Sequence, residues 1–189
     1  MSRDLINVDW SEIPCPIDDG MADHLHGIII PSVELIATDG KTVNLSKMLG
    51  ITIIYAYPRI GVPGVPPLFT NWDQIPGARG CTPQSCAFRD HFLELQSLGV
   101  SHVFGLSVQD TNYQKEAVER LHLPFTLLSD VNFALTKSLK LPTFGKGNIE
   151  LLKRITLVIK DGIVVKVFYP VFPPDKNAEE VINWLKIQE

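Results

Sequence analysis

Nearly continuous apolar segments alternate with amphipathic segments along most of the chain. Residues 51–57 are apolar and largely β-branched, which predicts a strand buried on both faces of a sheet. Residues 103–108 are expected to form the next strand. Apolar residues recur at helical spacing over 86–98, 110–121 and 177–187. The pattern therefore predicts helices that pack against a central sheet.

Two Asp-Gly pairs predict β-hairpins. The first, Asp39-Gly40, lies within residues 33–45. The second, Asp161-Gly162, lies within residues 154–169. The remaining expected elements are a helical turn capped by Ser46, a strand over 124–128, a helix over 132–139 and a loop over 141–148. This order of elements is typical of the α/β class, with a mixed central β-sheet flanked by helices.

The chain is expected to divide into an extended N-terminal arm, residues 1–29, and one domain, residues 30–189. The arm shows neither the helical nor the strand period. Its two histidines within residues 23–26 suggest a metal site, but no third ligand is adjacent, so a polar surface segment is the favoured interpretation.

Residues 59–80 are predicted to form a long loop that leads directly to Cys81. The loop contains four prolines and four glycines. Loops of this length inside a compact domain are often functional. Phe69 and Trp72 could shape a substrate entrance, form a dimer face or pack on their own domain. The chain is accordingly expected to be a monomer or a homodimer.

Composition argues against several classes of protein. The chain has 189 residues, of which 45% are hydrophobic and 20% charged, as expected for a globular domain with its own core. A net charge of −4 disfavours nucleic-acid binding, and no basic run marks a membrane surface. The polar N-terminus does not resemble a secretory signal, and no apolar run could span a membrane. Three cysteines are too few for a disulfide scaffold, so a cytoplasmic location is expected.

Cys81 opens a predicted helix, an arrangement suited to thiol chemistry. A thiolate attacks a peroxide, whereas a thiol scarcely does. A free cysteine has a pKa of ~8.5, and lowering it to about 6 requires roughly 3.4 kcal/mol of differential stabilisation. A helix N-terminus supplies about 0.3–1 kcal/mol, or ~2 kcal/mol in good geometry, so a cation is also required. Arg79 and Arg154 are the candidates, and Arg154 either faces the site or extends to water.

Cys86 follows Cys81 by five residues. In a regular helix this spacing corresponds to a rise of about 7.5 Å and a turn of about 140°. Disulfide-bonded Cα atoms normally lie within ~6.8 Å, so a bond between oxidised Cys81 and Cys86 requires the first turns to unwind. Pro83, which lacks an amide donor, favours such unwinding. The alternative is that Cys86 is a buried, inert cysteine.

The other cysteine, Cys15, is interpreted as a bystander thiol in the arm. No cluster of His or Cys residues completes a four-ligand metal site with Cys81 and Cys86. Neither a metal nor another cofactor is therefore expected.

The run from Gly80 to Asp90, GCTPQSCAFRD, resembles the active-site segment of peroxiredoxins of the bacterioferritin-comigratory or Q type. The resemblance covers most of residues 30–189 and includes Tyr57-Pro58, Phe104-Gly105-Leu106-Ser107, residues 125–130 and residues 154–159. It implies a thioredoxin-like fold and a thioredoxin-dependent peroxidase without a cofactor. The implied partners are hydrogen peroxide or an organic hydroperoxide and a thioredoxin-like reductant.

The same resemblance implies roles for individual residues. Cys81 corresponds to the peroxidatic cysteine, Cys86 to the resolving cysteine, and Arg154 to the arginine that steadies the thiolate and polarises the peroxide. Pro58 matches the proline that opens the catalytic loop. Pro58, Thr82 and Arg79 are therefore expected to contribute to substrate binding.

One position departs from the family pattern. Three residues before the peroxidatic cysteine the family usually has Thr or Ser, whose hydroxyl binds the peroxide, but this chain has Ala78. The candidates to replace that hydroxyl are Thr82, Thr70, Thr143 and the backbone amides near Gly80. Lower catalytic efficiency is expected. The alternative function is a non-catalytic or redox-sensing thioredoxin-like module, whereas the C-x4-C spacing disfavours a disulfide oxidoreductase.

Overall fold

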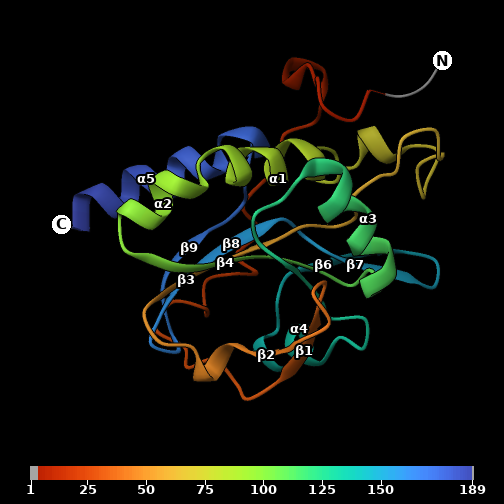
Figure 1. Ribbon diagram of the computed structural model, residues 1–189. Helices are drawn as coiled ribbons and strands as arrows, with labels where there is room; N and C mark the ends of the chain where they lie inside the picture. Colours follow the sequence, from red (N-terminus) through yellow and green to blue (C-terminus); the bar gives the residue numbers. More distant parts are fainter. Residues whose placement is uncertain (1–3, 189) are drawn as a thin grey trace.

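A seven-stranded mixed β-sheet separates two helical layers in the computed structural model, which describes residues 4–188 (Figure 1). The strand order is β2-β1-β5-β4-β3-β8-β9. The bounds of these strands are β1 Glu34–Ala37, β2 Thr42–Asn44, β3 Ile51–Ala56, β4 Val100–Ser107, β5 Leu127–Ser129, β8 Ile155–Lys160 and β9 Ile163–Phe168. The central strand β3 is parallel to β4 and antiparallel to β8.

Helices α1, α2, α3 and α5 cover one face of the sheet, and the short helix α4 lies on the other (Figure 1). Their bounds are α1 Cys81–Asp90, α2 Phe92–Ser97, α3 Thr111–Leu121, α4 Ala134–Leu139 and α5 Asn177–Gln188. Short 3-10 helices are η1 Trp10–Glu12, η2 Leu45–Lys47, η3 Trp72–Gln74 and η4 Pro174–Lys176. Within residues 4–188, no helix is both long and apolar enough to cross a membrane.

Strand β3 is buried on both faces, as its apolar sequence predicts. Ile53 and Tyr55 pack in the cluster beneath α1, α3 and α5. Ile54 and Ala56 point to the opposite cluster, which contains residues of α4. Because side chains alternate along a strand, β3 contributes to both apolar clusters. The strand ends at Ala56, shortly before the long loop that leads to Cys81.

Both Asp-Gly hairpins are confirmed, since β1 pairs antiparallel with β2 and β8 with β9. The prediction of a loop over 141–148 is wrong. Its residues form β6 Thr143–Lys146, which pairs antiparallel with β7 Ile149–Leu152. Gly147, at φ 63°, provides the turn, and Phe144 pairs with Leu151, so the hairpin buries an apolar face that its Gly- and Lys-rich sequence concealed.

Other details also differ from the expectation, and β4 begins at Val100, three residues before the expected start at 103. The helix expected over 86–98 is interrupted at His91, where α1 ends and α2 begins. Strand β5 starts at Leu127 and not at 124, because Pro124 and its neighbours form the approach to the strand. The turn at η2 is capped by Asn44, whose side chain accepts a hydrogen bond from the Ser46 amide, and not by Ser46 itself.

The described part of the N-terminal arm makes contact with distant parts of the chain. Ile29 forms an isolated bridge with Ile163 at the edge strand β9. Further toward the N-terminus, the chain reaches the helical face beside the start of α1, where η1 lies (Figure 1). The indole nitrogen of Trp10 there donates to Asp175 in η4 over 3.0 Å.

Candidate active site

Helix α1 begins at Cys81 because Gly80 takes a conformation that other residues avoid. Gly80 has φ 106°, and a Cβ atom there would lie 2.6 Å from the Trp10 ring and 2.7 Å from Pro174. Pro83 is tolerated because it lies in the first turn, where its missing amide would have no helical partner. Cys81 is consequently held at the helix N-terminus with only 4% of its surface exposed.

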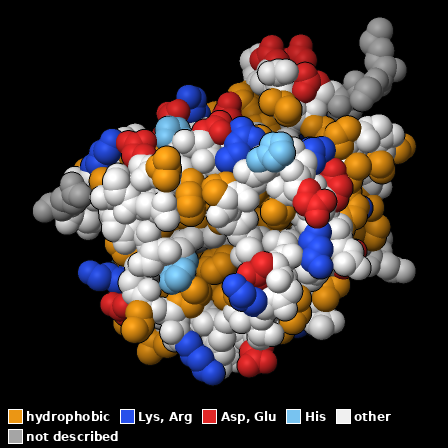
Figure 2. Space-filling view, viewed as in Figure 1, with side chains coloured by type: hydrophobic (Ala, Val, Ile, Leu, Met, Phe, Trp, Pro, Cys, Tyr) orange, Lys and Arg blue, Asp and Glu red, His pale blue; other side chains and the backbone are white. Residues whose placement is uncertain are grey.

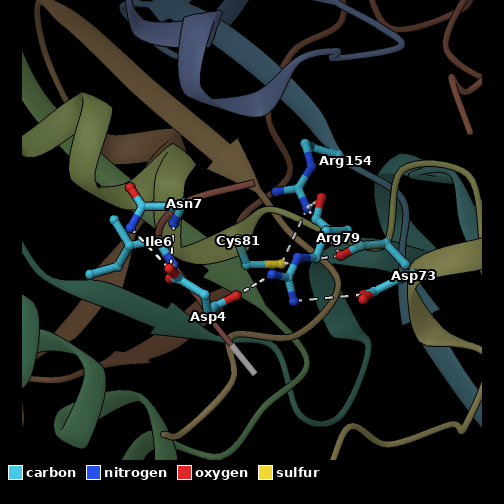
Figure 3. A network of polar contacts seen from close by, with 8 residues as sticks. Asp4, Ile6, Asn7, Asp73, Arg79, Cys81 and Arg154 are labelled. Atoms are coloured by element: carbon cyan, nitrogen blue, oxygen red, sulfur yellow. Dashed lines mark hydrogen bonds and ion pairs between the residues drawn. The ribbon is translucent and has the colours of Figure 1, made fainter. Parts of the chain in front are cut away.

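Arg154 brings a cation to the Cys81 thiol. It directly precedes β8, has 3% of its surface exposed, and places Nη2 3.2 Å from the Cys81 Sγ atom (Figure 3). The same nitrogen also donates to the backbone oxygens of Gly77, Ala78 and Arg79, over 3.2, 3.3 and 3.2 Å. Arg154 therefore faces the site and does not extend to water, and it also fixes the turn that leads into α1.

Three buried polar residues that sequence reasoning missed support this arginine. Gln84 accepts from Arg154 Nη1 over 2.5 Å and donates from Nε2 to Asn177 Oδ1 over 3.0 Å. The hydroxyl of Thr156 donates to the same Asn177 oxygen over 2.6 Å. A sequence signal existed, because Gln84 is one helical turn from Cys81 and shares its face with apolar Phe88. Asn177 had no such signal.

A small cavity of about 40 Å³ lies against Cys81. Its lining combines residues next to the cysteine with the long loop, the arm and α3, and comprises Leu5, Arg59, Gly61, Val62, Val65, Pro66, Pro67, Leu68, Trp72, Ala78, Arg79, Gly80, Cys81, Thr82 and Tyr113. The edge of the molecule that carries the long loop shows many apolar side chains (Figure 2). The cavity wall combines apolar side chains with the polar groups of Cys81, Thr82, Tyr113 and the two arginines Arg59 and Arg79.

The predicted substrate-binding residues are distributed unequally around this cavity. Thr82 and Arg79 line it, whereas Pro58 is buried outside the lining. Ala78 is fully buried in the wall, where the family usually has a hydroxyl. Of the threonines considered as replacements, Thr82 reaches the cavity. Thr70 is exposed, and the hydroxyl of Thr143 donates to Glu150.

Arg79 connects the site to the arm and to the long loop. Its Nη2 donates to the backbone oxygen of Asp4, and its Nη1 lies 3.7 Å from an Asp73 carboxylate oxygen (Figure 3). These contacts draw the guanidinium toward Asp4 and Asp73. Arg154 donates to the sulfur, and Arg79 links Asp4 and Asp73 to the segment that precedes Cys81.

Cys86 lies on the same helix as Cys81, half-buried, and all three cysteines are free thiols. Burial raises the pKa of the Cys86 thiol, while the nearby Arg89 opposes this shift. Beneath α1, burial also raises the pKa values of Tyr55 and Tyr57, which keeps both phenols neutral. Cys15 is exposed in the arm, apart from the cavity. Within residues 4–188, no three His, Cys, Asp or Glu side chains are grouped to hold a metal ion.

Comparison with known proteins identifies the family. Residues 26–182 match the family model described as Redoxin. Peroxiredoxin Q, chloroplastic, from Populus jackii is 34% identical over 158 residues, which cover 82% of this chain and 65% of the relative. The corresponding protein of Suaeda salsa is 33% identical over 162 residues, covering 85% and 67%. The chain thus spans about two thirds of the length of these curated relatives.

The solved structure of peroxidoxin BcpB from Mycobacterium tuberculosis superimposes with a TM-score of 0.68 at 21% identity, covering 87% of this chain and 97% of that one. This similarity confirms the thioredoxin-like fold. The family model and the sequence relatives show that the chain belongs to the redoxin family and, within it, to the peroxiredoxin Q group.

Proposed function

We propose that this chain is a thiol peroxidase that reduces hydrogen peroxide or organic hydroperoxides through Cys81. The observation that carries the proposal is the 3.2 Å contact between Arg154 Nη2 and the Cys81 sulfur inside a buried pocket. A guanidinium stays charged at every physiological pH and favours a thiolate beside it. The first turn of α1 adds its N-terminal dipole to the same effect.

In the first step, the Cys81 thiolate attacks the outer peroxide oxygen and the O–O bond breaks. The leaving hydroxide or alkoxide takes a proton from water, and Cys81 becomes a sulfenic acid. Arg154 donates hydrogen bonds to the negative charge as it moves from sulfur to the leaving oxygen. Thr82 lines the cavity, and its hydroxyl can orient the peroxide in place of the hydroxyl that the family usually has at position 78.

In the second step, Cys86 attacks the Cys81 sulfur, hydroxide leaves as water, and an intramolecular disulfide forms. A dithiol donor of the thioredoxin type then reduces this disulfide and is itself oxidised. Both cysteines belong to α1 in the reduced state, so the helix must unwind locally for the second step. The small number of cysteines fits a reducing compartment such as the cytoplasm, although the curated relatives are named as chloroplastic.

The test is peroxide consumption by the wild type and by three cysteine variants. Cys81→Ser should abolish turnover. Cys86→Ser should retain turnover with a small-thiol donor and lose it with thioredoxin. Cys15→Ser, which removes the exposed thiol, is the matched control and should behave as the wild type. Unchanged turnover in Cys81→Ser would refute the proposal.

A second candidate function is a redox-sensing module, which Ala78 favours because the site lacks the usual hydroxyl at that position. A sensor would oxidise at Cys81 stoichiometrically but would not turn over with any dithiol donor. Multiple turnovers in the same assay exclude it.

A further inference from the structure

A line of buried hydrogen bonds leads from Arg154 to the start of α5. Arg154 donates to Gln84, Gln84 donates to Asn177, and the Asn177 side-chain amide lies 3.4 Å from a Glu180 carboxylate oxygen. Gln84 and Asn177 have 0% of their surface exposed, so water cannot replace either partner. The line joins the residue before β8 to α1 and α5, and Gln84 is 70 residues from Arg154 and 93 residues from Asn177 in sequence.

The direction of these hydrogen bonds is fixed at the Arg154 end and supported at the Glu180 end. A guanidinium only donates, so the oxygen of Gln84 must face Arg154 and its NH₂ group must face Asn177. Burial raises the pKa of Glu180. When its carboxylate is ionised it only accepts, so it then draws the NH₂ group of Asn177 and leaves the Asn177 oxygen toward Gln84. The Thr156 hydroxyl can donate or accept, so it does not decide the direction.

We propose that Asn177 is a positioning residue for Arg154, holding the Gln84 oxygen on one guanidinium nitrogen so that the other stays on the Cys81 sulfur. A Gln84 side chain that turned over would present its NH₂ group to the guanidinium. Two donor groups cannot share a hydrogen bond, so Arg154 would have to move away from Cys81. The inference rests on the proposed role of Cys81 as the reactive thiolate.

The test uses a parent protein with Cys15→Ser and Cys86→Ser, in which Cys81 is the remaining thiol. The rate of alkylation by iodoacetamide is measured from about pH 5 to about pH 9, a range that brackets the titration of reactive thiols. Asn177→Leu should slow alkylation at low pH by about tenfold, the effect of weakening a charge-assisted hydrogen bond. At high pH, where any cysteine is ionised, its rate should approach that of the parent.

Thr156→Val is the matched control, because it removes the other donor to the Asn177 oxygen and leaves the Gln84 contact in place. Its pH profile should remain that of the parent. In a Gln84→Leu background, Asn177→Leu should change the low-pH rate by less than about twofold, since its route to Arg154 is already broken. Asn177→Ser, whose hydroxyl is too short to reach Gln84, replaces the Leu variant if that variant does not fold.

The outcomes separate the two proposals. A parent profile equal to that of a free cysteine refutes the thiolate role of Cys81 and with it this inference. A parent that reacts rapidly at low pH, with a folded Asn177 variant that follows the same profile, overturns the inference alone. Equal slowing in the Asn177 and Thr156 variants also overturns it, because a structural role would affect both.

Discussion

Replacing Arg154 tests the electrostatic basis of the site most directly. Arg154→Met keeps a side chain of similar reach and removes the charge, whereas Arg154→Lys keeps the charge. A lysine ammonium cannot reproduce the planar set of contacts to Gln84, Cys81 and the three backbone oxygens. We expect activity to fall in the order wild type, Lys, Met.

The size of the effect follows from the geometry. Opposite charges about 4 Å apart attract by about 4 kcal/mol at an effective dielectric constant of ~20. The backbone oxygens of residues 77–79 also accept from the guanidinium and take up part of its positive potential. A net loss of about 2–4 kcal/mol corresponds to a rate reduction of roughly 30- to 1000-fold for Arg154→Met.

The assay is the single-turnover rate of peroxide reduction, measured by stopped flow as a function of pH. Arg154 also satisfies buried acceptors, each costing about 1–3 kcal/mol when left unpaired, so thermal unfolding must be followed in parallel. Arg120→Met is the control, since the Arg120 guanidinium pairs with Glu116 and donates to the Gly61 backbone oxygen, and Arg120 does not line the cavity. A folded Arg154→Met variant within about threefold of the wild-type rate would refute the reasoning.

Three further substitutions test the surroundings of Cys81. Ala78→Thr should raise the rate of peroxide reduction several-fold, because it restores a hydroxyl in the cavity wall. Ala78→Val, whose side chain has the shape of threonine without the hydroxyl, should not raise it. A rate increase in both variants would contradict the reasoning. Gly80→Ala should lower the melting temperature more than Gly40→Ala. Both glycines have a positive φ, 85° at Gly40, so both variants carry backbone strain of about 1–3 kcal/mol, or roughly 2–12 °C in melting temperature. Only at Gly80 would the added Cβ also clash, because at Gly40 no atom lies within 4 Å of it. Trp10→Ala removes the ring that packs on Gly80 at the start of α1, so the Cys81–Cys86 disulfide should form faster and less sulfinic acid should accumulate at high peroxide. Both products are measured by mass spectrometry, and Trp10→Phe should change them less. Identical sulfinic acid yields would disprove a role for the arm.

The sequence predicts those parts of the site that depend on local pattern or on a single energetic requirement. The N-terminal position of Cys81 follows from helical periodicity, and the need for a cation follows from the weakness of a helix terminus. The position of Trp10 over Gly80 could not be predicted in the same way. It depends on a contact with Asp175, 165 residues away, which leaves no trace in either segment's periodicity. The β6–β7 hairpin was missed for a related reason, because its buried pair Phe144 and Leu151 is recognisable only once the strands are paired.

In the proposed mechanism, the contacts that would prepare Cys81 for attack also oppose the unwinding that the second step would require. Arg154 holds the backbone oxygens of residues 77–79 and the thiolate together, and Trp10 packs on Gly80 at the start of the same turn. Oxidation to a sulfenic acid removes the negative charge from the sulfur, so the attraction to Arg154 weakens only after peroxide has reacted. The proposed mechanism would thereby couple the release of α1 to the oxidation of Cys81. The mechanism predicts that α1 stays folded until peroxide reacts with Cys81, and that the cost of unwinding is lower when Cys86 attacks.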